Sequence, residues 1–363
     1  MRRRTARRSR RLQLLGLVLM AISALAFVAC GDDEPEGGGA NGGGAAADAE
    51  PASKEIKTVG LALAGARNDR SFYQSHYDGA EEARKELGFE LNVVDNLEEP
   101  QAQTEGFTNL ARAGNDVVIG AGGVFYQAAD TVAAQYPDTH FIVTQGATTK
   151  FYENVTSISP DQALPSYVAG VTMAMQSKSK VIGVLGGLEI PPTVQNYLGI
   201  KQGAEATVPD IKVLNTVVGS FNDAAKARTA AEAQIADGAD VIFAFLDSAY
   251  AGVLKAAEGK DIALLGPIFP RCDLSEMYMG TTISNNVKLV SNALRDLSEG
   301  KLEPGAKYYG VDDPTVQTFE LCPNFETPEL TKAVEESLAG LNSGEITLPP
   351  EALHARPDYY EGP

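Results

Sequence analysis

Residues 57–65, KTVGLALAG, and residues 180–187, KVIGVLGG, open two stretches of sequence with the same order of apolar segments. GFELNVVD (88–95) and DVVIGAG (116–122) follow the first, and DIKVLNTVVGS (210–220) and DVIFAFLD (240–247) follow the second. In both stretches the third segment comes directly after a Gly-x-Asp turn. An internal repeat of this kind predicts two similar lobes with a cleft between them.

The class of the fold follows from how these segments alternate with helical patterns between residue 56 and about residue 300. Further apolar runs are HFIVTQG (140–146), VTSISP (155–160) and IALLGP (262–267). Most runs carry Val, Ile and Leu on both faces, which is typical of strands covered by helices on both sides. Residues 75–87 have the spacing of a helix, Gly88 suits its end, and a last helix is predicted over 325–341. The alternation predicts an α/β protein with parallel, doubly wound sheets.

The folded part is too long for one such sheet, so we expect two lobes joined by a hinge. The first lobe is assigned residues 56–160 plus about 281–305, and the second 161–280 plus about 306–345, with 346–363 as a tail. Crossings between lobes are expected near 158–164, 280–284 and 305. In open α/β sheets ligands bind beyond the carboxyl ends of the strands. The polar and aromatic cluster at 68–77, directly after the first strand, is therefore a candidate half of the cleft.

The N-terminus has the features of an export signal. Residues 1–11 contain seven arginines and no acid, residues 12–29 are largely apolar, and Cys30 follows small residues. This pattern predicts a lipoprotein signal peptide with Cys30 as the acylated residue, while an uncleaved anchor helix is the alternative. Residues 31–55 are mostly Gly, Ala and acids and predict a disordered linker. We expect export, by either the general or the twin-arginine route, and a lipid anchor on the outer face of the cell membrane.

Charge and motif content exclude several classes of function. Removal of the signal segment lowers the formal net charge from −18 to about −25, which disfavours binding to nucleic acid. The sequence lacks a G-x-S-x-G elbow, a phosphate-binding loop and metal-ligand spacing among its three histidines, so we expect no enzyme activity, metal or cofactor. Cys272 and Cys322 remain as a pair in an exported chain and predict a disulfide, with two separate thiols as the alternative.

Several ordered blocks resemble the basic membrane protein family of ABC transporter substrate-binding lipoproteins, the purine nucleoside receptors. NDRSFYQSHYDGA (68–80) resembles the signature DDxSFNQxxxEG, and GSFNDAAKARTAAEAQIADGADVIF (219–243) resembles GSFxDxxKGKxxAxxxxxxGADVIF. Residues 117–141, 154–187, 192–203 and 285–288 resemble further family blocks in the same order. The resemblance covers roughly residues 57–300 and implies a periplasmic-binding-protein type I fold.

The resemblance also implies how a purine nucleoside is held between the lobes. Aromatic rings would stack on the base, and carboxylates and a lysine would address the ribose hydroxyls. The positions that match are Asn68, Asp69, Ser71, Phe72, Tyr73, Tyr197, Phe221 and Lys288, with Asn68 in place of an Asp and Tyr73 in place of an Asn. Five of them have a structural alternative: core packing for the rings of Phe72, Tyr197 and Phe221, a helix N-cap for Asp69, and a solvated helix position for Lys288.

Two departures from the family pattern weaken the expectation of a nucleoside. Thr144-Gln145 stands where the family has an Asp, and Pro267 to Cys272 replaces a segment that carries another Asp. The predicted disulfide would hold this altered loop. Gln145, Asp247 and Tyr250 are the candidates for replacement contacts, although Asp247 could instead be a helix N-cap. A different ring-bearing or polyol ligand is the alternative.

The functional expectation is a solute-binding lipoprotein of an ABC importer that captures a small molecule by closure of its lobes. Its partners would be the ligand, the permease and ATPase subunits and the membrane through the lipid, with the protein itself a monomer. Two alternatives are a ligand-sensing ectodomain that partners a signalling protein and a binding protein for a non-nucleoside small polar ligand.

Overall fold

A computed structural model describes residues 55–69, 72–145 and 152–353. The predicted signal peptide, Cys30, almost all of the linker, Ser71 and the end of the tail lie outside the described residues. Within these residues no helix combines the length and the apolar character needed to cross a bilayer.

The described residues form a first sheet of six strands in the order β11-β5-β4-β3-β1-β2, and all pairings among these strands are parallel. Its strands are β1 (Thr58–Leu63), β2 (Glu90–Val94), β3 (Val117–Ala121), β4 (His140–Thr144), β5 (Val155–Pro160) and β11 (Gly305–Tyr309). The residues of β3, β4 and β5 are buried along their whole length, as expected for strands covered on both faces.

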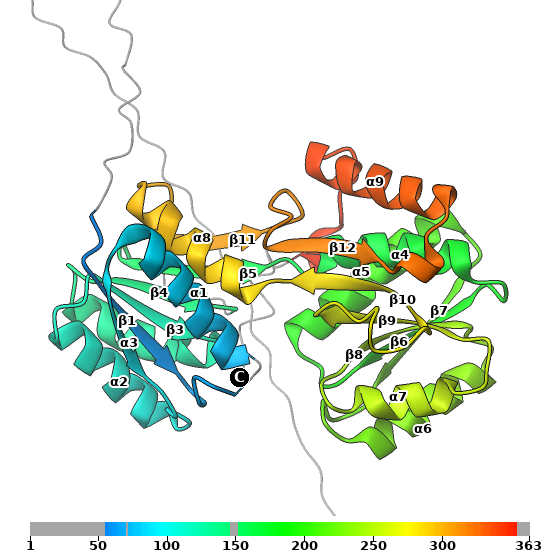
Figure 1. Cartoon of the computed structure of the whole chain (residues 1–363), viewed down its shortest axis with the longest axis horizontal. Coiled ribbons are helices and arrows are strands. Elements are labelled where there is room, and N and C mark those ends of the chain that lie inside the picture. The colour runs from blue at the N-terminus through cyan, green and yellow to red at the C-terminus, as the bar shows by residue number, and fades with distance from the viewer. Residues whose placement is uncertain (1–54, 70–71, 146–151, 354–363) are drawn as a thin grey trace, which may run out of the picture. The chain divides into compact units, whose positions relative to one another are not determined.

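In the described part of the chain, the helices that cover the first sheet are α1 (Phe72–Leu87), α2 (Pro100–Arg112), α3 (Tyr126–Val132) and α8 (Asn286–Ser298). Helices α1 and α8 lie side by side on one face, and α2 and α3 lie on the other (Figure 1). Helix α1 begins at Phe72, three residues before the predicted start. The Asp69 carboxylate accepts the backbone N–H groups of Tyr73 and Gln74, which satisfies donors that the first turn leaves free.

The second sheet also contains six strands, in the order β12-β10-β9-β8-β6-β7. Its strands are β6 (Val181–Gly186), β7 (Lys212–Val217), β8 (Val241–Phe245), β9 (Ala263–Ile268), β10 (Tyr278–Ser284) and β12 (Gln317–Leu321). Only the pairing of β12 with β10 is antiparallel within the described residues. The expected α/β class with two doubly wound lobes is thereby confirmed.

Helices α4 (Ala163–Gln176), α5 (Pro191–Thr207) and α9 (Pro328–Ser343) cover one face of the second sheet, and α6 (Ala224–Ala236) and α7 (Tyr250–Ala257) cover the other (Figure 1). Short 3₁₀ turns occupy Gly123–Phe125, Ala133–Gln135, Pro323–Phe325 and Pro350–Ala352. Helix α9 begins and ends slightly later than predicted, because Thr327 caps its first turn and Gly344 ends it in a left-handed conformation.

Two strands differ from the expected division of the chain. Strand β10 runs to Ser284 within the second sheet, although residues from about 281 were assigned to the first lobe. Strand β11 pairs with β5 in the first sheet, so the chain crosses after Tyr309 and not near 305. Strand pairing decides both cases, and a partner strand far away in the sequence leaves no local signal.

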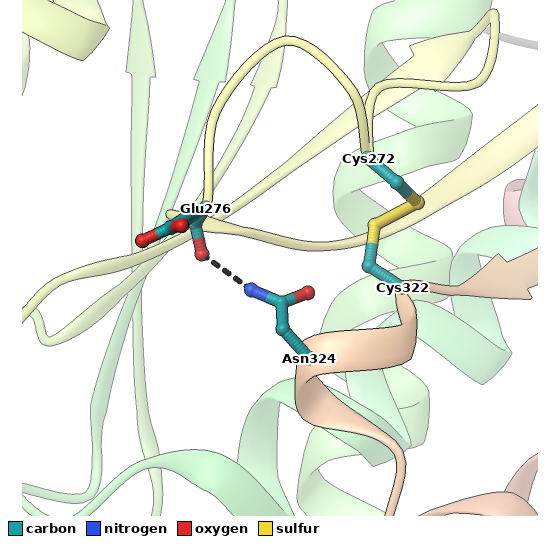
Figure 2. The surroundings of a disulfide bond; sticks show 4 residues. All are labelled: Cys272, Glu276, Cys322 and Asn324. Carbon is teal, nitrogen blue, oxygen red and sulfur yellow. Dashed lines mark hydrogen bonds between the residues drawn. A yellow bond between two sulfur atoms is a disulfide. The ribbon is translucent and has the colours of Figure 1, made fainter.

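The disulfide predicted between Cys272 and Cys322 is formed, with the two Cα atoms 5.3 Å apart (Figure 2). It joins the loop after β9 to the end of β12. The side-chain amide of Asn324 donates to the carbonyl of Glu276 at 2.6 Å and ties the same two segments together (Figure 2). The loop that departs most from the family pattern is therefore fixed at its far end.

Candidate functional site

A cavity of about 500 Å³ lies at the carboxyl ends of the strands of both sheets. That volume is within the usual range for small-molecule sites. Residues of both lobes and of the connecting segments line it: Phe72, Gln145, Gln162, Pro192, Phe221, Asn222, Phe245, Leu246, Asp247, Tyr250, Pro267, Ile268, Phe269, Arg271, Leu274, Ser284 and Asn286. Most of this wall is aromatic or aliphatic, with a small number of amide and charged groups.

Among the described residues, three on the cavity wall belong to the first lobe. Phe72 begins α1, Gln145 follows β4, and Asn286 begins α8. The side-chain amide of Gln145 donates to Asn286 Oδ1 at 2.6 Å, and Asn286 Nδ2 donates to Ser75 Oγ at 3.2 Å. Gln145 has a φ of 52°, a left-handed conformation that is uncommon for a residue other than glycine. These hydrogen bonds fix the polar groups at this end of the sheet.

The ring of Phe72 packs against a buried histidine, His76. The ring centroids of Phe72 and His76 are 4.4 Å apart, and His76 is fully buried. Burial lowers the pKa of His76 to about 4, against a smaller opposing effect of its hydrogen bond to the Phe72 carbonyl. The imidazole is therefore neutral at physiological pH and acts as a packing surface for the Phe72 ring.

The second lobe contributes a cluster of aromatic rings. Phe221 and Phe245 meet edge to face with centroids 5.7 Å apart, and Phe221 lies against Gly187, where any side chain would collide with the ring. Tyr250 begins α7, and the exposed Asp247 lies in the turn before it. The N-cap position of α7 is Ala249, so Asp247 does not cap this helix.

The loop after β9 supplies the remaining wall and a cation. Pro267, Ile268, Phe269 and Arg271 all line the cavity. Ile268 has a φ of 74°, which is strained for a β-branched residue. Arg271 lies 5.1 Å from the centre of the Tyr250 ring and 5.8 Å from that of Tyr278. Strain and a buried charge at one loop are typical of ligand sites.

Two polar residues lie where the chain passes between the sheets. The side-chain amide of Gln162 donates to Ser284 Oγ at 3.0 Å, and both residues are buried and line the cavity. The Oε1 atom of Gln162 is buried without a hydrogen-bond partner. A buried acceptor of this kind is unfavourable unless a ligand or water donates to it.

The predicted site residues divide into two groups. Phe72, Gln145, Phe221, Asp247 and Tyr250 line the cavity. Asn68, Asp69, Tyr73, Tyr197 and Lys288 do not, and Ser71 lies outside the described residues.

Four of the predicted residues that do not line the cavity make identified contacts elsewhere in the fold. Asp69 caps α1, and the Tyr73 ring packs over Gly65. Tyr197 packs against the core of the second lobe. Lys288 forms an ion pair with Glu82 on α1 at 2.7 Å. The helix cap at Asp69 and the core packing of Tyr197 are the structural alternatives named for these positions, whereas Lys288 is paired with Glu82 instead of being only solvated.

The sequence reasoning missed several lining residues. Gln162, Ser284 and Asn286 lie next to the predicted crossings, and that proximity was the one available signal. Arg271 was named only as part of a loop that lacked an expected carboxylate. Its side chain reaches the cavity because the loop turns back over Gly266, which no pattern in the sequence indicates.

The arrangement suits binding of a small molecule with a flat ring. Phe72 comes from one lobe and Phe221 from the other, and both present partly buried rings to the cavity. Aromatic side chains and amides together select a ring with polar edges. Among the described residues no group of three or more His, Cys, Asp or Glu side chains is placed to hold a metal ion.

A family model described as "ABC transporter substrate-binding protein PnrA-like" matches residues 56–344. Among curated relatives, the chain is 26% identical over 327 residues to the "ABC transporter nucleoside-binding protein BmpA" of Lactococcus lactis, covering 81% of this chain and 89% of that one. It is 26% identical over 301 residues to a "purine-binding protein" of Brucella abortus, covering 81% and 83%.

Solved structures agree on the fold. The Bacillus halodurans transcriptional activator of the comK gene superposes with a TM-score of 0.69 and 22% identity, over 80% of this chain and 99% of that one. An ABC transporter solute-binding protein of Conexibacter woesei superposes with a TM-score of 0.64 and 22% identity, over 81% and 99%.

Proposed function

The chain belongs to the Bmp family of PnrA-like ABC transporter substrate-binding proteins, and from that premise we propose that it captures a purine nucleoside or a related ring-bearing molecule for an importer. It is an extracytoplasmic solute-binding protein, and its family consists of substrate-binding proteins rather than enzymes. One observation carries the choice of ligand class: rings from both lobes, Phe72 and Phe221, line one cavity of about 500 Å³. The names of the relatives from Lactococcus and Brucella support the same class.

Capture would proceed by closure of the lobes around the ligand. In the liganded state Phe72 and Phe221 would stack on the two faces of the ring, and Gln145, Gln162 and Asn222 would hydrogen-bond its edges. A ligand that contacts both lobes stabilises the closed state by its differential affinity for that state. The permease would then recognise the closed form.

The direct test is isothermal titration of the purified protein, freed of any co-purified ligand, with adenosine, guanosine, inosine and uridine. We expect micromolar or tighter binding of at least one purine compound. Phe72→Ala and Phe221→Ala should each weaken it about 10-fold or more, because each removes one stacking face. Tyr126→Ala is the control, since that ring is 43% exposed on α3 and lies outside the cavity wall. Equal affinities for all three variants would contradict the proposal.

The attachment to the membrane is a separate part of the proposal. Cys30 would carry the lipid and residues 31–55 would act as the tether, and relatives in Pyrococcus species are named lipoproteins. Metabolic labelling with an alkyne-modified fatty acid tests it. The wild type should be labelled and Cys30→Ala should not, whereas equal labelling of both would contradict an anchor at Cys30. Size-exclusion chromatography with light scattering tests the expected monomer.

A second candidate function, ligand sensing for a signalling partner, is favoured by one observation. A relative in Bacillus subtilis, 21% identical over 274 residues, is named a transcriptional activator. Uptake of the radiolabelled ligand distinguishes the two functions. Deletion of the gene should abolish uptake if the protein serves an importer, and should leave uptake unchanged if it only senses the ligand.

A further inference from the structure

One arginine on the cavity wall is buried. Arg271 is 7% exposed, and among the described residues no other Lys or Arg is classed as buried. Arginine and lysine are almost never buried without a partner. Its surroundings therefore indicate what the cavity accepts.

The neighbours of Arg271 leave its charge without a counterion. The Nη2 group is 3.4 Å from the carbonyl of Pro267, and Nε has no acceptor. The guanidinium faces the rings of Tyr250 and Tyr278. No Asp or Glu of the described residues forms an ion pair with Arg271. Asp247 lies on the same cavity wall and does not pair with it either. By contrast, Arg67 and Arg295 each lie 2.7 Å from a carboxylate.

The loop is built to hold this side chain in place. A Cβ atom on Gly266 would lie 2.3 Å from Arg271 Nε, so only glycine leaves room for the arginine there. The next residue, Cys272, is fixed by the disulfide to Cys322 (Figure 2). The two tyrosine rings flank the guanidinium. Arg271 is thus a positioned group and not a flexible surface side chain.

A buried and unpaired cation is unfavourable, because transfer from water removes hydration that only hydrogen bonds and an opposite charge replace. The protein supplies a weak hydrogen bond to the Pro267 carbonyl, a hydrogen bond with the Tyr278 hydroxyl and two ring faces, none of which carries a full negative charge. An acidic group of a ligand would supply the rest, since a carboxylate or a phosphate accepts two parallel hydrogen bonds from a guanidinium.

We propose that the ligand carries an acidic group, a carboxylate or a phosphate, that binds Arg271 while its ring lies between Phe72 and Phe221. This inference rests on the proposed function, because it names the ligand class of the same cavity. Asp247, which is exposed on the same wall, is then free to accept hydrogen bonds from hydroxyl groups of the ligand.

A matched series of compounds tests the inference. Adenosine, adenosine 5′-carboxylate and adenosine 5′-monophosphate share one base and one sugar ring and differ in the group at C5′. Uracil and orotate form a second pair, in which only orotate carries a carboxylate. We expect an anionic member to bind at least about 10-fold more tightly than its neutral partner in isothermal titration. The carboxylate and phosphate members show which acid is accepted.

Substitution of the arginine supplies the second arm. Arg271→Gln should weaken binding of the anionic compound about 100-fold or more. The anionic compound should then bind no more tightly than the neutral one. Arg271→Lys should retain part of that advantage, because the charge remains while the two-pronged geometry is lost. Arg228→Gln is the control. It removes the same charge from an exposed ion pair on α6 and should leave all affinities unchanged.

Stability of the ligand-free protein separates a binding role from a structural one. If Arg271 awaits an anion, Arg271→Gln should melt at the same temperature as the wild type or higher without ligand, and should lose the rise in melting temperature that the anionic compound produces. A lower melting temperature without ligand, together with unchanged preference for the anion, would assign Arg271 to the fold and overturn the inference.

Two further outcomes of the titrations separate this inference from the proposed function. Tight binding of adenosine that is lost in Phe72→Ala, with no gain from an acidic group, would leave the proposed function standing and overturn this inference. Failure of every neutral and anionic compound would count against the proposed ligand class itself, and the inference would fall with it.

Discussion

The Nε2 atom of His76 lies 2.8 Å from Oγ1 of Thr144, and this contact joins α1 to the end of β4 beneath the cavity. The Nδ1 atom of His76 is 2.8 Å from the carbonyl of Phe72, which can only accept, so Nδ1 carries the proton and Nε2 accepts from the Thr144 hydroxyl. That hydroxyl in turn accepts the N–H of Gly122 at 2.9 Å. Thr144 stands where the family pattern has an Asp. Here its hydroxyl positions the His76 ring, against which Phe72 packs.

The folded protein should lose stability as the pH decreases, because of His76. Its pKa is about 4 in the folded protein and about 6.5 when unfolded, so the unfolded chain gains a proton first as pH falls. Above pH 6.5 His76 is neutral in both the folded and the unfolded state, and its titration does not change the free energy of unfolding. Between pH 6.5 and 4 the loss of stability grows, to about 2 kcal/mol at pH 5. Urea unfolding at pH 7.5 and pH 5 checks this. The advantage of the wild type over His76→Gln should shrink by that amount, and a constant difference would contradict it.

Lys288 should matter little for binding. The family resemblance implies a contact with ribose, but its Nζ pairs with Glu82, and both side chains are about one-third exposed. The pair stabilises the protein by less than about 1 kcal/mol, as is usual for ion pairs in contact with water. We expect Lys288→Met to change ligand affinity less than about twofold in titration, beside Phe72→Ala as the variant that loses binding. A loss of 10-fold or more would mean that Lys288 leaves Glu82 when the ligand binds.

The disulfide should support both stability and binding. Cys272 and Cys322 are 50 residues apart, and closure of a loop of that length stabilises the fold by about 4 kcal/mol in the chain-entropy treatment. The bond also adjoins Arg271. The double variant Cys272→Ser/Cys322→Ser should therefore melt at a lower temperature and bind the ligand more weakly. Scanning calorimetry and titration check these effects, and an unchanged affinity would show that the loop holds Arg271 without the bond.

Gly266 should be coupled energetically to Arg271. Gly266→Ala places a Cβ atom against Arg271 Nε and Cδ, so the guanidinium must move away from its site. We expect weaker binding of the ligand in Gly266→Ala. The same change should have little further effect in the Arg271→Ala background, where the Cδ and Nε atoms that the new Cβ would meet are gone. A double-mutant cycle measures the coupling, and additive effects would contradict the contact.

The sequence by itself determined the class of fold and most of its strands. Repeated apolar runs, Gly-x-Asp turns and an even pair of cysteines are local signals, and burial of both strand faces leaves a clear record in composition. The resemblance to the family blocks identified Phe72 and Phe221 as candidate rings, and both line the cavity.

Only the tertiary structure decided which polar groups reach the ligand site. Lys288 turns to Glu82 on a neighbouring helix, while Arg271 turns back over Gly266 into the cavity. Strand β11 joins the first sheet by pairing with β5, about 150 residues earlier in the chain. Each outcome depends on contacts between segments far apart in sequence. Such contacts are set by packing and strand pairing in three dimensions, and the local pattern of residues does not record them.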